Sequence, residues 1–227
     1  MLPESKFLNL AYFETLRNKI NKQLERVKPD LNQKEKAIVD DQIHQFKWLY
    51  GALGQVPSDV MFIAENPSIT GVKHAHIDTV DQQPPDIEAQ WWGGKNDKCA
   101  KVFRPVLCDL GLKTSPPNEK GGWNCYITNV IKQANYAKFQ EKVSSGYRKQ
   151  QGNYWSDILR WEIETVNPKV IFCLGKNSET VVRRLIQEGR IQDIPVFYVL
   201  HYSARDSFEN IRNAMKAQIE EGIALIL

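Results

Sequence analysis

The chain lacks several features that would define a protein class at once. Its 227 residues contain no apolar run long enough to cross a bilayer, and the opening MLPESKFLNLAYF lacks the uninterrupted apolar core of a signal peptide. The four cysteines form no Cys-x-x-Cys pair, so we interpret them as buried thiols in a reducing compartment and expect no metal or iron–sulfur cofactor. We therefore expect a cytoplasmic protein without a membrane contact.

Neither sign of charge dominates the composition. The net charge of +3 permits a nucleic-acid partner without requiring one. Basic residues do gather in two stretches, one near Lys98 and one that includes Lys132 and Lys138. Such stretches indicate either a solvated face or a polyanion site, and the composition leaves both interpretations open.

What the sequence does contain is a regular alternation of short apolar runs and helical periodicity. The apolar runs, which predict strands, cover residues 60–64, 125–128, 170–174 and 196–200. Helical spacing predicts helices over about 97–110, 154–166 and 178–187, and Asp206 with Glu209 resembles a capping box for a last helix. Strand and helix alternate four times, which predicts an α/β three-layer sandwich with a four-stranded parallel sheet.

Two further helices are expected before the sheet, over about 3–29 and 33–53. No repeat or low-complexity linker separates them from the rest of the chain. We therefore predict one domain over 1–227, with a helical amino-terminal cap at 1–57 and a sheet domain at 58–227.

Polar residues follow the predicted strands at the point where each strand ends. Glu65 and Asn66 follow the first strand, Asn129 follows the second, and His201 with Ser203 follows the fourth. Each of these residues also has a purely structural interpretation. Asn66 before Pro67, for example, is typical of a simple turn. Because the carboxyl ends of parallel strands share one edge, their convergence favours a ligand crevice there.

A long polar segment near the first strand end is also notable. Residues 71–90 show no clear periodicity, and loops of this length inside a domain are often functional. The segment ends at Trp91 and Trp92 before two glycines. The two indoles are either core anchors or a flat surface for a nucleic-acid base.

Four segments resemble the uracil-DNA glycosylase superfamily over about residues 58–223. They are AENPS at 64–68, YITNVIK at 126–132, PKVIFCLGKNSETVVRRL at 168–185 and LHYSAR at 200–205. The resemblance implies a monofunctional DNA N-glycosylase that acts on DNA, and we expect a monomer.

The resemblance also implies roles for individual residues. Asn66 stands where the superfamily positions the attacking water, and Glu65 stands where one branch has a glutamate. Asn129 would hydrogen-bond the edge of the flipped base, because an amide offers both a donor and an acceptor. His201 would face the base oxygen beside the scissile bond.

The DNA contacts are implied in the same way. Trp92, or in its place Trp91, would stack on the base, and Arg205 falls where the family has its wedge. Ser203 would bind a phosphate. The remaining predicted DNA-binding residues are Tyr202, Lys132 and Lys138.

The chain departs from the family pattern in three ways. None of the cluster cysteines of the iron–sulfur branch is matched, and HYS replaces the commoner His-Pro-Ser, which removes the rigidity of proline. Ser68 occupies the place where strict uracil enzymes have a tyrosine that excludes a 5-methyl group. A small residue there implies that the base is uracil or a 5-modified pyrimidine, for repair or for defence against phage DNA.

Two alternatives come from other functional classes. A nucleic-acid-binding protein on the same fold would have lost the chemistry, which the presence of Asn66 and His201 disfavours. A small-molecule hydrolase is disfavoured because the sequence has no Gly-x-Ser-x-Gly elbow and no metal-ligand cluster.

Overall fold

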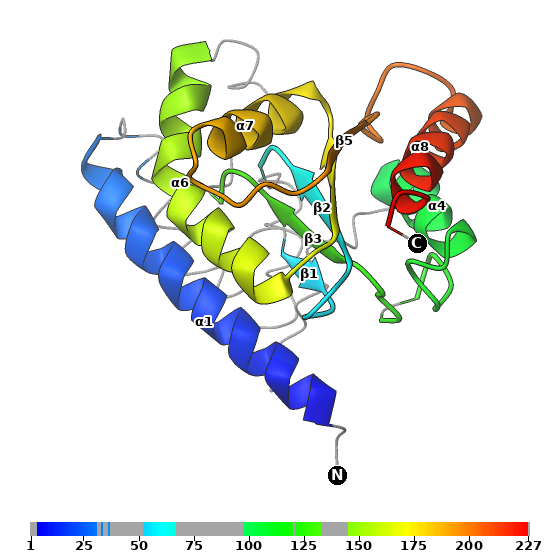
Figure 1. The fold of residues 1–227 in the computed structure, drawn as a ribbon, viewed down its shortest axis with the longest axis horizontal. Helices are drawn as coiled ribbons and strands as arrows, with labels where there is room; N and C mark the ends of the chain where they lie inside the picture. Colours follow the sequence, from blue (N-terminus) through cyan, green and yellow to red (C-terminus); the bar gives the residue numbers. More distant parts are fainter. Residues whose placement is uncertain are drawn as a thin grey trace.

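The computed structural model describes residues 4–30, 33, 36, 52–66, 98–119, 121–132 and 145–226. Within them lies a five-stranded sheet of order β1-β3-β2-β4-β5 (Figure 1). The strands are β1 (Leu53–Gly54), β2 (Val60–Ala64), β3 (Tyr126–Asn129), β4 (Val170–Leu174) and β5 (Val196–Val199). β1 pairs antiparallel with β3, and the other three pairings are parallel. The four parallel strands are those expected, but the prediction of a four-stranded, entirely parallel sheet is wrong.

The additional strand β1 is too short to leave a pattern in the sequence. A Cβ atom at Gly54 would lie 2.0 Å from the carbonyl oxygen of Cys125, and Gly54 has a φ of +118°, so only glycine fits this close pairing. The helix predicted over 33–53 therefore does not extend to its expected end. Residues 33 and 36 are helical, and the remainder of that prediction lies outside the described residues.

Most helices lie at the expected places along the chain, but α6 begins at Ser145, earlier than the predicted start at about 154. They are α1 (Glu4–Val27), the 3₁₀ turn η1 (Lys28–Asp30), the π-helical turn η3 (Cys99–Phe103), α4 (Arg104–Asp109), α6 (Ser145–Val166), α7 (Lys176–Gln187) and α8 (Phe208–Ile223). The cap of α8 differs from the prediction. Ser207, rather than Asp206, is the N-cap, and its Oγ accepts a hydrogen bond of 3.2 Å from the Asn210 amide. Asp206 instead accepts from the Ser207 amide at 2.6 Å.

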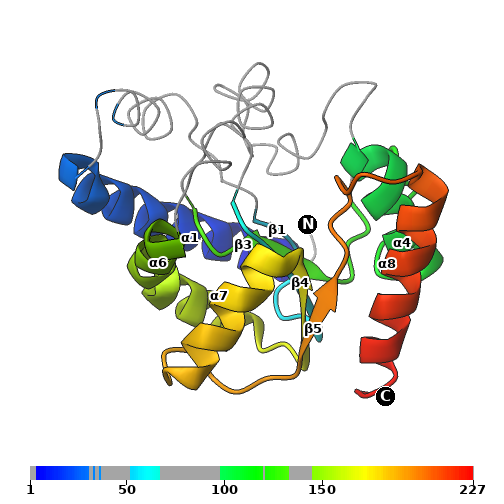
Figure 2. The ribbon, with the colours of Figure 1, turned by 90° about the horizontal axis from the view of Figure 1, so that it is seen from above.

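Both faces of the sheet are buried, which explains the continuous apolar runs. Met61 and Ile63 pack in one core cluster with residues of α1, α6 and α7, whereas Phe62 and Ala64 pack in another with residues of η3, α4 and α8. Figures 1 and 2 show α1, α6 and α7 on one side of the sheet and α4 with α8 on the other. The complete three-layer arrangement stays a prediction, because long connecting segments lie outside the described residues.

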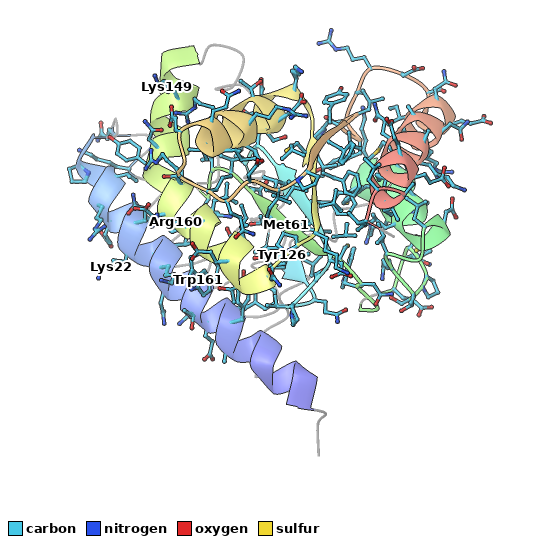
Figure 3. The ribbon with its side chains drawn as sticks, viewed as in Figure 1. Lys22, Met61, Tyr126, Lys149, Arg160 and Trp161 are labelled. Carbon is cyan, nitrogen blue, oxygen red and sulfur yellow. The ribbon has the colours of Figure 1, made fainter. Side chains whose placement is uncertain are left out.

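Helix α1 shares the core of the sheet although it precedes the first strand by many residues. Its Leu16, Ile20 and Leu24 are fully buried in the same cluster as Met61. Trp161 of α6 takes part in this contact, and Figure 3 shows it between α6 and α1. Among the residues described, no helix is long and apolar enough to span a membrane.

Candidate functional site

The ends of β2 and β3 are joined beyond their last paired residues. Ala64 is in register with Asn129, the Val130 amide donates to the Ala64 carbonyl at 2.9 Å, and the Ile131 amide donates to the Glu65 carbonyl at 2.9 Å. Asn129 is buried, with 3% of its surface exposed, whereas Glu65 is half-buried. The backbone therefore holds Glu65 beside the end of the strand that carries Asn129.

The ends of β4 and β5 complete the same edge. Gly175 donates its amide to the Val199 carbonyl at 2.8 Å, and its φ is +94°. A Cβ atom at Gly175 would lie 3.5 Å from the Cβ of His201, so the two strand ends touch. Asn177, in the first turn of α7, donates from Nδ2 to Oε2 of Glu65 at 2.9 Å. The structure thus brings Glu65, Asn129 and His201 to one edge, with Asn177 as a link between β2 and α7.

The protonation state of His201 follows from its hydrogen bonds. The backbone N–H of Ser203 donates to His201 Nδ1 at 3.1 Å, and a backbone amide can only donate. Nδ1 is therefore the acceptor, and the proton of the neutral ring is on Nε2. Burial, with a smaller contribution from the Lys98 ammonium, lowers the pKa of His201 from 6.5 to about 4. At neutral pH the ring is uncharged and offers Nε2–H as a donor.

The two other predicted residues of the His201 loop have different environments. The Ser203 hydroxyl lies 2.6 Å from His201 Nδ1, so it contacts the imidazole, and a phosphate contact stays a prediction. Arg205 is exposed, as a wedge requires, and its role also stays a prediction. Tyr202 is half-buried, and its ring stacks on the His201 ring with centroids 4.2 Å apart.

Lys132 does not lie on the surface, as its predicted contact with DNA requires. Its side chain has no exposed surface; it forms an ion pair with Glu162 of α6, which is equally buried, and donates to Thr128 Oγ1 at 2.6 Å. The prediction that Lys132 binds DNA is therefore corrected, because a phosphate cannot reach this ammonium. Burial lowers the pKa of Lys132, and the adjacent Glu162 carboxylate opposes that shift.

The buried carboxylate also joins two tyrosines into this network. Tyr126 of β3 donates to Glu162 Oε1 at 2.7 Å, and Tyr12 of α1 donates to the Tyr126 hydroxyl at 2.8 Å. Burial and the Glu162 charge raise the pKa of both tyrosines. A continuous chain of polar contacts therefore runs from α1 through β3 to the lysine that follows Asn129.

Several predicted site residues lie outside the described residues. They are Ser68, Trp91, Trp92 and Lys138. Asn66 is described and half-buried at the end of β2. The stacking ring and the residue next to the 5-position of the base therefore stay predictions from sequence.

Three residues at or near the site were not predicted from the sequence. Asn177 follows a strand end by three residues, so the rule that singled out Asn129 would have found it. Lys98, whose Nζ lies 3.4 Å from the Ser203 carbonyl, had no signal beyond a basic stretch. Glu162 lies on a helix among apolar residues, and a carboxylate there indicates a buried partner.

Three of the four cysteines lie in the core around the sheet. Cys99, Cys125 and Cys173 are buried, Cys108 is half-buried, and all four are free thiols. Burial raises the pKa of Cys108. In the part of the chain that the structure describes, no three His, Cys, Asp or Glu side chains are grouped closely enough to hold a metal ion.

Comparison with known families agrees with this arrangement. A family model described as Uracil DNA glycosylase superfamily matches residues 52–221. The chain belongs to this superfamily. The matched region includes all five strands and the His201 loop, whereas α1 lies before it. Comparison with curated proteins finds no match.

Proposed function

We propose that this protein is a DNA glycosylase that flips a base out of DNA and hydrolyses its N-glycosidic bond. Membership of the uracil DNA glycosylase superfamily supports the reaction class. The observation that carries the proposal within the site is the neutral His201 ring with its proton on Nε2. Cleavage leaves negative charge on the departing base, and a fixed N–H donor stabilises that charge.

The remaining chemistry requires a water molecule below the sugar. Asn66 would orient this water, because its amide cannot ionise and so cannot act as a base. Glu65 is the second catalytic candidate on this edge. The hydrogen bond from Asn177 supports that role, since it holds the Glu65 carboxylate in one orientation.

Recognition of the base requires that it leave the DNA stack. Asn129 would hydrogen-bond its Watson–Crick edge, and Trp92 or Trp91 would stack on its face. Arg205 would act as the wedge that fills the gap in the duplex. Ser203, Tyr202 and Lys138 would contribute contacts to the DNA backbone.

The proposed substrates are uracil and pyrimidines with a substituent at the 5-position. Ser68 is small where strict uracil enzymes have a tyrosine, so the steric penalty against an added group is reduced. The polar segment 71–90 follows and offers hydrogen-bonding groups for a hydroxymethyl or sugar substituent. Such a pocket suits either base-excision repair or defence against phage DNA that carries modified bases.

The test is release of free base, with formation of alkali-labile sites, in duplexes that contain uracil, 5-hydroxymethyl or glucosylated pyrimidines. We expect Asn66→Ala to lower the rate by about 100-fold or more while DNA binding changes little, because the water matters mainly in the transition state. Asn213→Ala, at an exposed asparagine of α8, is the matched control and should retain the parent rate.

Two outcomes would contradict parts of this proposal. If the parent protein binds DNA but releases no base from any duplex, the chain is a non-catalytic binding protein on this fold. If release is confined to uracil and Ser68→Tyr leaves it unchanged, the broad pocket is wrong.

A further inference from the structure

The loop that carries His201 is connected to the core through a series of aromatic rings. Phe62 of β2 packs edge-on against Phe103 of η3, with ring centroids 5.3 Å apart and an interplanar angle of 82°. Phe103 stacks on Tyr202 at 5.9 Å and 23°, and Tyr202 stacks on His201 at 4.2 Å and 29°. Phe62 and Phe103 are fully buried. The series therefore begins in the core and ends at the imidazole.

The loop itself is a tight turn that is closed by its own backbone. The Ala204 amide donates to the His201 carbonyl at 2.9 Å, and the Ser203 amide donates to His201 Nδ1 at 3.1 Å. The bond to Nδ1 determines which nitrogen carries the proton and, with the Ser203 hydroxyl 2.6 Å from the same atom, restrains one edge of the ring. The face of the ring is contacted by Tyr202.

The segment that contains η3 contacts the turn at a second place. Lys98 directly precedes η3, and its Nζ lies 3.4 Å from the Ser203 carbonyl oxygen. On its other side η3 is attached to α8, because Arg212 donates from Nε to the Lys101 carbonyl at 2.7 Å. A π-helical turn is rare and is frequently found at functional sites. Here it supplies both Lys98 and the Phe103 ring to the His201 loop.

Tyr202 occupies the position where the resembled motif more commonly has proline. Proline restrains such a turn through its fixed φ, and tyrosine has no such restraint. The stack replaces this backbone restraint with a contact on the face of the imidazole. Aromatic pairs at these centroid distances and angles are favourable beyond the area they bury.

We propose that Tyr202 is a positioning residue for His201. The Phe103–Tyr202–His201 stack fixes the plane of the imidazole, while the Ser203 amide fixes its tautomer, and together they hold Nε2–H in one direction. The functional part of this inference rests on the proposed glycosylase activity, since a fixed donor direction matters where charge develops on a leaving base. The structural part concerns the state of the His201 ring and can be tested without substrate.

The experiment compares Tyr202→Phe, which keeps the ring, with Tyr202→Leu and Tyr202→Met, which remove it. Phe208→Leu is the matched control, because Phe208 is an exposed aromatic residue near η3 that has a contact with Lys101 and lies outside the stack. The first readout is the ¹⁵N NMR signature of the His201 ring at neutral pH. The chain has four histidines, so the signal is assigned by its loss in His201→Gln.

We expect the parent, Tyr202→Phe and Phe208→Leu to show a single ring state with the proton on Nε2. In Tyr202→Leu and Tyr202→Met we expect a broadened or mixed signature. The second readout is single-turnover base release at saturating DNA, which should fall on the order of tenfold in the two non-aromatic variants.

Each contrary result has a distinct meaning. A non-aromatic variant that keeps both the parent signature and the parent rate overturns the positioning role. Tyr202→Phe that loses the signature also overturns it, even if both non-aromatic variants fail to fold, because the ring would then not be the cause. A parent protein that releases no base contradicts the proposed function, and the NMR comparison still decides whether the stack positions His201.

Discussion

The carboxyl ends of β3 and β5 lie on the same edge of the sheet but are held by different means. After β3, Lys132 and Glu162 form an ion pair with no exposed surface. After β5, half-buried His201 is held by the backbone amide and the hydroxyl of Ser203 and by the ring of Tyr202. The first arrangement belongs to the folding core, and the second is partly exposed to solvent.

This difference predicts that substitutions at the two places will have separable consequences. Removal of one partner from a buried pair leaves an uncompensated charge, so the effect appears in the free energy of unfolding. Removal of a donor at a half-buried site is expected to lower mainly the rate of the reaction that uses it.

Lys132→Met should destabilise the protein by about 3–5 kcal/mol, because the Glu162 carboxylate would stay buried without its cation. The free energy of unfolding in urea measures this loss. Lys132→Met combined with Glu162→Gln should recover much of this stability, since the amide oxygen can still accept from Tyr126 and no charge remains.

Lys169→Met is the control. The side chains of Lys169 and Asp59 in its ion pair are 58% and 62% exposed, so a loss of stability of about 0–1 kcal/mol is expected. Equal losses at the two lysines would contradict the comparison.

His201→Gln should lower the single-turnover rate of base release by about 100- to 1000-fold, the usual result when one donor to developing negative charge is lost. Its unfolding midpoint in urea should stay close to that of the parent. If the variant is strongly destabilised but retains the parent rate, His201 contributes to stability, as Lys132 does, and not to the reaction.

The pH dependence of activity should reflect the pKa of His201, which burial and Lys98 lower to about 4. Activity should not change through pH 6–8 on account of this ring. It should fall as the pH approaches 4, because protonation of Nδ1 removes the acceptor of the Ser203 amide that orients the ring. The neutral ring also contributes stability that is fully present above the unfolded pKa of about 6.5 and is lost as the pH falls through the folded pKa.

Lys98→Gln should raise the pKa of His201 towards its ordinary value, because one of the two causes of the shift is removed. The acid limb of the rate profile should therefore move to higher pH. The shift should be partial, since burial is the larger cause. An unchanged acid limb would show that Lys98 has no electrostatic effect on the ring.

Tyr12→Phe should destabilise the protein by about 1 kcal/mol, because it removes the donor to the Tyr126 hydroxyl and leaves the ring in place. This variant tests whether α1, which precedes the matched residues 52–221, folds together with the sheet. Thr15→Ala, at an exposed position of the same helix, should change stability by less. If α1 unfolds in a separate transition, the two regions are not one cooperative unit.

Much of this architecture could be read from the amino-acid sequence because it depends on local patterns. The run Val60–Ala64 is the strand β2 as expected, since a strand buried on both faces must be continuously apolar. The order of the strands along the chain brought Glu65, Asn129 and His201 to one edge by the rules of parallel crossovers. The superfamily could be recognised for the same reason, because its motifs are the segments at the strand ends.

Other features depended on groups that are distant in the sequence, and only the tertiary structure decided them. Lys132 is the clearest case: its environment is set by Glu162 on α6, and nothing near Lys132 in the sequence distinguishes it from a surface lysine. The short strand β1 was missed because two residues carry no periodicity, and its pairing depends on the approach of Cys125 to Gly54.

The properties of His201 divide in the same way between those set by the sequence and those set by the tertiary structure. Its position after the last strand was determined by the sequence alone, as was the replacement of proline by Tyr202 beside it. Its tautomer, its lowered pKa and its contact with the Tyr202 ring were decided by folding, which brings Lys98 and Phe103 against the loop from a segment about a hundred residues earlier. Burial and long-range contacts determine protonation and orientation, and a linear pattern of residue types does not contain them.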